Sequence, residues 1–247
     1  MTPRKTAPET THLRFDIVLA RQVALYVMTE LGEENLNESF AQVCNYLSED
    51  AARHSRKSNH PKLFDPVGLD HLARKYLAGY RQSIFPSVPG TQPDDLVGLV
   101  MQAAYGYTPE ETERIKFEHR HAMIAENCVG ALLERYLESV LRTNGWHWCC
   151  GNFVKAVDFV RRGNDGKWQA LQIKNRDNSE NSSSSAIRHG TEIEKWFRFF
   201  SRTGKTNWEN LPEFMCGYGL SESDFLGFVK SYLLRQKQVR SSTPPTT

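Results

Sequence analysis

The sequence contains no apolar run of the about 20 residues that a membrane-spanning helix requires. It also carries little net charge, because 31 basic and 29 acidic residues leave +2 at pH 7. The missing apolar run argues against an integral membrane protein. The near balance of charge means that attraction to a polyanion has to come from local clusters of charge. Total charge therefore argues neither for nor against a nucleic-acid partner.

Cysteines are few, odd in number and irregularly spaced, at Cys44, Cys128, Cys149, Cys150 and Cys216. This pattern does not predict a disulfide framework, and the N-terminus runs into no apolar segment. We therefore expect a reduced, cytoplasmic protein without a signal peptide. One segment, His147-Trp148-Cys149-Cys150, suggests a zinc site, but a tetrahedral site needs a second pair of ligands, which does not follow.

The first half of the chain has the periodicity of helices. Apolar residues recur with a helical period in the ranges 15–31, 40–52, 69–80 and 94–105. Thr108, Pro109 and two glutamates then follow in the order typical of a helix start. We expect a mainly helical region over 1–110 for dimerisation or DNA contact, a catalytic core over 111–240 and a disordered tail over 241–247. The basic stretch 52–62 is either a solvated loop or an arm that contacts phosphates.

The second half changes to short aromatic and β-branched segments. The ranges 146–148, 153–160 and 168–173 predict strands, and Asn164-Asp165-Gly166 predicts a hairpin turn between the last two. After a serine-rich segment, the spacing of apolar residues predicts helices over 191–200 and 224–236. The fold class expected is α/β, with a central mixed β-sheet flanked by helices and a helical N-terminal region.

Three polar residues lie where this hairpin brings two strands together. Asp158 precedes the turn, and Gln172 and Lys174 follow it on one face of the second strand, because side chains alternate with a period of two. Hydrolysis of a phosphodiester needs a divalent cation held by oxygen ligands, and a nearby positive side chain. Asp158, Gln172 and Lys174 provide such a set.

A glutamate on the preceding helix completes the candidate site. Glu134 lies at the edge of an apolar stripe, where a helix packed on the sheet can direct it toward a metal ion. Glu138 and Glu126 are the alternatives on the same helix. Alone, the pattern D…QxK also fits a surface strand with an ordinary salt bridge.

The order of these residues resembles the core of PD-(D/E)XK nucleases: a helix with Gly130 before Glu134, then Asp158, then a hairpin to Gln172-x-Lys174. The resemblance implies that Glu134 and Asp158 bind Mg²⁺ and that Lys174 orients or activates the attacking water. Gln172 stands where the family more often has Glu or Asp. We expect one firmly bound metal ion, since an amide binds a hard cation less strongly than a carboxylate.

A narrower resemblance extends over residues 60 to 215. It is carried by VKAVDF (154–159), LQIKNRDNSENSS (171–183), AIR (186–188), KWF (195–197) and NWEN (207–210). These runs resemble the SinI family of type II restriction endonucleases. The resemblance implies cleavage of double-stranded DNA at GGWCC, where W is A or T, in the bacterial cytoplasm. It also implies a DNA methyltransferase that protects the host's own sites without binding this protein.

Short hydrogen-bonding side chains follow Lys174 directly. Arg pairs with guanine, Asn with adenine, and acidic groups with cytosine, so the segment suits a G/C-rich major-groove site. The alternative is a polar linker. The residues predicted to bind DNA are Asn175, Arg176, Asn178, Ser179, Asn181, Ser183, Arg188 and His189.

A near-palindromic target predicts a homodimer in which each subunit cuts one strand. Two other functions remain open at this point, ahead of a structural or interaction protein as a third. One is a repair or junction nuclease that reads DNA shape rather than sequence. The other is a catalytically inactive DNA-binding module, which the departure at Gln172 suggests.

Overall fold

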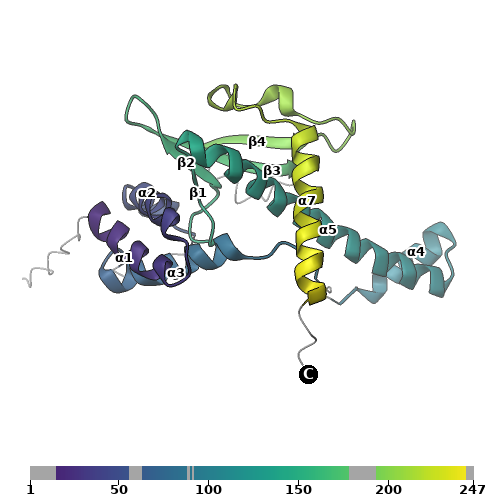
Figure 1. Ribbon diagram of the computed structural model, residues 1–247. Coiled ribbons are helices and arrows are strands. Elements are labelled where there is room, and N and C mark those ends of the chain that lie inside the picture. The colour runs from purple at the N-terminus through teal and green to yellow at the C-terminus, as the bar shows by residue number, and fades with distance from the viewer. Residues whose placement is uncertain (1–14, 56–62, 88–89, 91, 178–192, 243–247) are drawn as a thin grey trace, which may run out of the picture. The chain divides into compact units, whose positions relative to one another are not determined.

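The computed structural model describes residues 15–55, 63–87, 90, 92–177 and 193–242, which form two compact units (Figure 1). Unit 1 contains the described residues up to Arg81, those of Gly145–Leu171, and Ile193. Unit 2 contains the described residues of Gln82–Asn144 and the remaining ones from Gln172 onward. Unit 1 is therefore assembled from segments that are far apart in the sequence.

Three helices belong to unit 1: α1 (Ile17–Thr29), α2 (Asn37–Ser48) and α3 (Pro66–Arg81). Short 3₁₀ turns, η1 (Glu34–Leu36) and η2 (Ala51–Arg53), flank α2. Asp16 caps α1, since its side chain accepts hydrogen bonds from the backbone N–H groups of Val18 and Leu19. The expected helices over 15–31, 40–52 and 69–80 are confirmed within a few residues at each end.

Helix α3 approaches the loop after β1 (His147–Trp148) very closely. A Cβ atom on Gly79 would lie 2.4 Å from the backbone nitrogen of Gly151. The Cys150 thiol donates to the carbonyl of Tyr76 at 3.4 Å. Only a residue without a side chain fits at position 79, so this glycine sets the distance between helix and loop.

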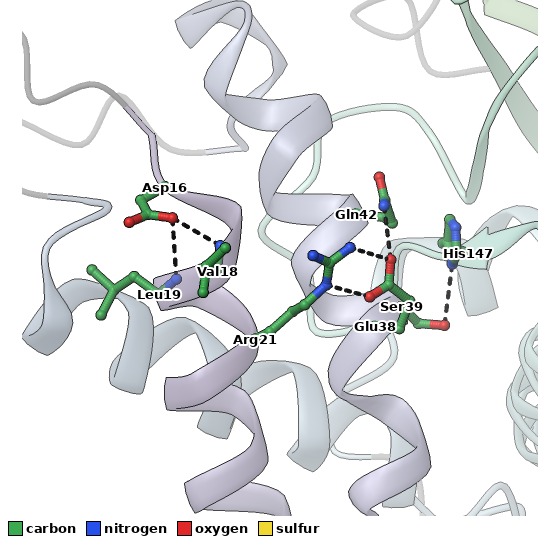
Figure 2. A network of polar contacts seen from close by, with 8 residues as sticks. All are labelled: Asp16, Val18, Leu19, Arg21, Glu38, Ser39, Gln42 and His147. Carbon is green, nitrogen blue, oxygen red and sulfur yellow. Dashed lines mark hydrogen bonds and ion pairs between the residues drawn. The ribbon is translucent and has the colours of Figure 1, made fainter.

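A polar network links α1, α2 and β1 within unit 1, and Figure 2 shows its members. Arg21 donates to both carboxylate oxygens of Glu38, at 2.5 and 2.9 Å, and this bond lowers the pKa of Glu38. Nδ1 of His147 lies 3.2 Å from the hydroxyl of Ser39. Burial lowers the pKa of His147 to about 4, so its imidazole is neutral at pH 7.

Unit 2 contains the helices α4 (Asp95–Tyr105), α5 (Pro109–Leu141) and α7 (Glu222–Ser242), with 3₁₀ turns η3 (Arg142–Asn144), η4 (Trp208–Asn210) and η5 (Glu213–Met215). The expected start of α5 is confirmed. The Thr108 side chain accepts from the Glu111 N–H, and the Glu111 carboxylate accepts from the Thr108 N–H. The predicted helices over 94–105 and 224–236 are also present.

A four-stranded sheet has the order β1-β2-β3-β4, with β2 (Phe159–Arg162), β3 (Trp168–Arg176) and β4 (Ile193–Phe199). Strand β2 is antiparallel to β1 and to β3, and Phe159 lies opposite Leu171. The Asn164-Asp165-Gly166 turn joins β2 to β3 as expected, and Gly166 takes a φ of +76°. Strand β3 begins in unit 1 and continues into unit 2. The chain is therefore mixed α/β.

Two predictions of secondary structure are wrong. The range 191–200, expected as a helix, contains strand β4, because sheet pairing outweighs its helical spacing of aromatic residues. The range 153–160 is a strand only from Phe159, since Asn152 and Ala156 adopt positive φ values that interrupt an extended chain. Val154 forms only an isolated bridge to His54.

Among the described residues, no helix is both long and apolar enough to cross a membrane.

Candidate active site

Asp158 is held by backbone hydrogen bonds on both sides. Its N–H donates to the carbonyl of Leu171 at 2.9 Å, and its carbonyl accepts from the N–H of Cys149 at 2.8 Å. The residue sits directly before β2, and its side chain is partly exposed. Ala156, two residues earlier, has a φ of 57°, a conformation that L-residues with a Cβ rarely adopt and that is common near functional sites. These backbone hydrogen bonds thus fix the position from which the Asp158 side chain extends.

Gln172 and Lys174 follow Leu171 on β3. Gln172 is buried, with 2% of its surface exposed, whereas Lys174 is partly exposed. Alternation along the strand places Gln172, Lys174 and Arg176 on one face. The hairpin therefore brings the Asp158 backbone to the residue before Gln172, as the sequence predicts, and Lys174 follows two residues later.

Glu134 lies on α5 within unit 2 and is partly exposed, between buried Leu133 and buried Tyr136. The alternative Glu138 is buried, and its carboxylate lies 3.5 Å from Arg142, the residue directly after α5. The other alternative, Glu126, pairs with Arg176 at 2.8 Å. Both alternatives to Glu134 are thus bound to arginines.

In the part of the chain that the structure describes, no group of three or more His, Cys, Asp or Glu side chains is arranged to hold a metal ion. The candidate set differs in kind, since it has two carboxylates, Glu134 and Asp158, and the amide of Gln172. All three are oxygen donors, which suit a hard cation such as Mg²⁺. The chemistry of the donor set therefore fits the metal that the sequence predicts.

Of the residues predicted to bind DNA, only Asn175 and Arg176 fall among the described ones. The side-chain oxygen of Asn175 accepts a hydrogen bond from Nε of Arg198 at 3.0 Å. The other six lie outside the described residues: Asn178, Ser179, Asn181, Ser183, Arg188 and His189. The basic residues Arg56, Lys57, His60 and Lys62 of the stretch 52–62 also lie outside them.

The sequence did not predict a polar network that lies beside the last residues of β3. Nη1 of Arg198 donates to Glu222 at 2.6 Å, and the other carboxylate oxygen of Glu222 accepts from the indole N–H of Trp208 at 2.6 Å. Arg198 falls in the range expected as a helix, but it lies on β4 with only 12% of its side chain exposed. The β-branched and aromatic residues of 193–199 were the available signal for a strand.

The strand end is also fixed one residue beyond β3. The N–H of Asp177 donates to the carbonyl of Phe199 at 3.2 Å, and the Asp177 carboxylate accepts from the N–H of Ser201 at 3.0 Å. Asn175 and Asp177 are thus both tied to the β4 segment. The segment predicted to read DNA starts from this anchored point.

Comparison with known proteins agrees with these observations. The sequence profile of the SinI restriction endonuclease family matches residues 20–235. The type II restriction enzyme Eco47I of Escherichia coli is 42% identical over 220 residues, which cover 87% of this chain and 95% of that enzyme. The type II restriction enzyme SinI of Salmonella infantis is 42% identical over 227 residues, which cover 90% and 98%. The chain therefore belongs to the SinI restriction endonuclease family and is a type II restriction enzyme.

Proposed function

We propose that the chain hydrolyses double-stranded DNA at GGWCC with a PD-(D/E)XK-type active centre formed by Glu134, Asp158, Gln172 and Lys174. The observation that carries the proposal is the β2–β3 hairpin. It hydrogen-bonds the Asp158 backbone to Leu171, the residue before Gln172. This is the order of acid, hairpin and lysine that the resemblance to PD-(D/E)XK nucleases implies.

The distances along α5 and β3 support the assignment of Glu134. The Glu126–Arg176 ion pair gives one point at which α5 and β3 meet. Glu134 lies eight residues further along the helix, about 12 Å at the helical rise. Gln172 lies four residues back along the strand, about 13 Å. If α5 and β3 run in opposite directions, these two lengths match, and Glu134 would lie level with Gln172.

Mg²⁺ is the cofactor that this donor set would hold, through Asp158, Glu134 and the side-chain oxygen of Gln172. When bound, it supplies positive charge that offsets the charge of the phosphate and lowers the pKa of a coordinated water. Lys174 is the cation of the set, and its ammonium donates hydrogen bonds to the attacking water and to phosphate oxygen. The buried amide of Gln172 is neutral, so Asp158 and Glu134 carry the negative charge of the donor set.

Recognition is assigned to the segment that follows Lys174. Arg176 contacts guanine, and the segment with Asn178, Ser179, Asn181, Ser183, Arg188 and His189 contacts the remaining base edges and phosphates. For Asn175, the hydrogen bond from Arg198 orients the amide, since the oxygen faces Arg198 and the NH₂ group points elsewhere. Asn175 therefore acts as a hydrogen-bond donor to DNA.

The active unit is a homodimer, and the surface that supports this proposal is on α4. Gly98 packs α4 against Thr112 of α5, where a Cβ atom would lie 3.4 Å from the threonine methyl group. Leu96, Leu99 and Val100 share another face of α4 and are all more than half exposed. A contiguous apolar helix face of this kind is typical of a protein interface, and in a two-fold dimer the face of one subunit can pack against the same face of the other.

A DNA methyltransferase of the same system protects the host sites.

The test is cleavage of unmethylated plasmid by the purified protein with Mg²⁺, with and without a chelator, followed by sequencing of the fragment ends. We expect discrete ends at GGWCC and no cutting in chelator. Asp158→Ala and Lys174→Ala should abolish cutting but retain DNA binding. Lys167→Ala, in the exposed hairpin turn, is the control and should cut normally.

Three other results would contradict the proposal. Ragged ends without sequence preference would indicate a repair or junction nuclease. Binding to GGWCC without any cutting would indicate an inactive DNA-binding module, the function that the neutral Gln172 favours. Full cutting by Asp158→Ala and Lys174→Ala would show that the active centre lies elsewhere.

A further inference from the structure

An ion pair joins α5 to the last residue of β3. Nη2 of Arg176 lies 2.8 Å from Oε1 of Glu126. The ring of Phe199 on β4 lies under the same guanidinium, 5.7 Å from its central carbon. Arg176 stands two residues after Lys174 and on the same face of β3. A carboxylate and an aromatic ring thus constrain one arginine beside the proposed active centre.

The pair contributes little to folding. The Arg176 side chain is 39% exposed and the Glu126 side chain 51% exposed. Ion pairs this open to water have small effects on stability, because solvent screens the attraction and ordering two long side chains opposes it. Removal of Glu126 should therefore leave the fold intact. Its effect should appear in the contacts that the Arg176 guanidinium makes.

Orientation decides what an arginine can read. A guanidinium recognises guanine O6 and N7 through two parallel N–H donors, which requires its plane to align with the base. An unconstrained arginine has to lose rotamer freedom on binding, and a side chain ordered beforehand has less to lose. Glu126 bonds one terminal nitrogen, and Phe199 restricts the plane of the group. The two contacts order Arg176 before DNA arrives.

We propose that Glu126 is a specificity-positioning residue, which holds Arg176 in the orientation that reads a guanine of the target. This inference rests on the proposed function, since it assumes that Arg176 contacts DNA bases. It gives Glu126 a role different from the metal ligand that its place on α5, one turn before Gly130, also suggests. The Glu126 carboxylate orients Arg176, and the metal ion is bound by Glu134, Asp158 and Gln172 instead.

The test is a double-mutant cycle on the full-length protein, with wild type, Glu126→Gln, Arg176→Lys and the double variant. Affinity is measured without divalent metal for a GGWCC duplex and for duplexes with one G·C pair replaced. The readout is the dissociation constant for the altered duplex divided by that for the GGWCC duplex. A purely structural role of Glu126 would not change this ratio. We expect Glu126→Gln to lower this ratio about tenfold, within the range that one bidentate base contact contributes. Arg176→Lys should lower it at least as much.

The double variant is decisive, because a residue that acts only through Arg176 has no further effect once the guanidinium is gone. We therefore expect the double variant to match Arg176→Lys. Glu126→Asp, which keeps a shorter carboxylate, should recover part of the discrimination. Glu118→Gln is the matched control, because Glu118 pairs with Arg114 at 3.9 Å on the same helix, and it should leave the ratio unchanged.

Two results would overturn the inference while leaving the proposed function in place. One is a wild-type ratio in Glu126→Gln. The other is an additive loss in the double variant, together with a higher Mg²⁺ requirement for cleavage, which would make Glu126 a metal ligand. A wild-type protein with no preference for GGWCC would instead overturn the proposed function itself. Thermal melting of each variant verifies that all are folded.

Discussion

Gln172 is an amide buried within β3, with 2% of its surface exposed, at a position where the PD-(D/E)XK pattern that the sequence resembles more often has an acid. A buried amide is tolerated without a cation, whereas a buried carboxylate is costly unless it is paired. A glutamate at this position should therefore be stabilised only if a metal ion binds beside it. The effect of Mg²⁺ on the melting temperature of such a variant can be measured without any cleavage assay.

For Gln172→Glu, we expect a lower melting temperature than wild type in chelator, by on the order of 5 °C, because the new carboxylate carries a charge at a buried position away from water. Addition of Mg²⁺ should recover much of this loss, so the rise in melting temperature should be larger than in wild type. The control is Gln169→Glu on the same strand, beside Arg161, which should show no extra rise. Equal rises in Gln172→Glu and wild type would place the metal elsewhere.

Much of the candidate site is predictable residue by residue, and the reason is local. Asp158, Gln172 and Lys174 lie on one hairpin, whose turn is encoded by Asn164-Asp165-Gly166, so their proximity follows from short-range geometry. The ion pair of Glu126 with Arg176 joins residues 50 positions apart, and no local pattern encodes it. The same holds for Arg198 and Glu222.

Among the elements, β4 was the one predicted wrongly as a helix. Its residues, Ile193 to Phe199, carry aromatic side chains whose spacing also suits a helix. Pairing within the sheet and burial of Trp196, with 2% of its surface exposed, outweigh that local preference. The helices with clear caps, such as α5 after Thr108, were predicted correctly because their signals are local.

The contact between α3 and the loop after β1 depends on Gly79. We expect Gly79→Ala to lower the free energy of unfolding by about 1–3 kcal/mol, because the new Cβ would lie 2.4 Å from the backbone of Gly151. Urea unfolding followed by circular dichroism measures this. Gly130→Ala is the control in the middle of α5, with nothing within 4 Å of the new Cβ, and should raise stability by about 1 kcal/mol. Equal stability of both variants would show that α3 is not packed this closely.

The contact between α2 and β1 predicts a dependence of stability on pH. His147 has its pKa lowered to about 4 by burial, below the about 6.5 of an unfolded chain. The unfolded state therefore binds the extra proton first. Stability is full above about pH 6.5 and falls as the pH drops toward 4, by on the order of 2–3 kcal/mol. His147→Gln should flatten this part of the curve, measured by urea unfolding between pH 4 and 7.

A different group governs more acidic solutions. The pKa of Glu38 is lowered by the hydrogen bond from Arg21, so its contribution is present above the unfolded pKa and is lost as pH falls through the lower folded value. Glu38→Gln should therefore change stability near neutral pH but leave the slope between pH 4 and 6.5 in place. A flat curve in wild type over that range would contradict the buried, neutral state of His147.

At the scale of the whole molecule, the exposed face of α4 makes a prediction about assembly. Wild type should sediment as a dimer at micromolar concentration, and Leu99→Lys should shift it toward monomer, because a charge on the apolar face opposes its burial. The control Val67→Lys, on α3 and 76% exposed, should remain dimeric. A monomer that still binds DNA should nick single strands rather than break the duplex. An unchanged sedimentation coefficient in Leu99→Lys would move the interface away from α4.

The division of the chain into units could not be predicted from the sequence order. Gly145–Leu171 groups with the first three helices through contacts such as Gly79 with Gly151, although more than 60 residues separate them. The composition of the sequence changes at Gly145. A boundary based on composition can divide the chain only into continuous segments, whereas unit 1 is discontinuous. Contacts between distant segments decide the grouping instead, and they depend on packing that a linear pattern does not contain.

Helix α5 is unbroken over 33 residues, about 50 Å. It carries Thr112 and Lys116, which seat α4, and further along Glu126 and Glu134. In the proposed dimer, α5 would set the distance between the α4 interface and the proposed active centre of each subunit. Each inserted residue lengthens a helix by about 1.5 Å but also rotates the rest of the helix by about 100°. Only insertions of about seven or eleven residues return the rest of the helix to nearly the same rotation. In the proposed dimer, the spacing between the two cuts would therefore change only in coarse increments, and no series of substitutions would adjust it gradually.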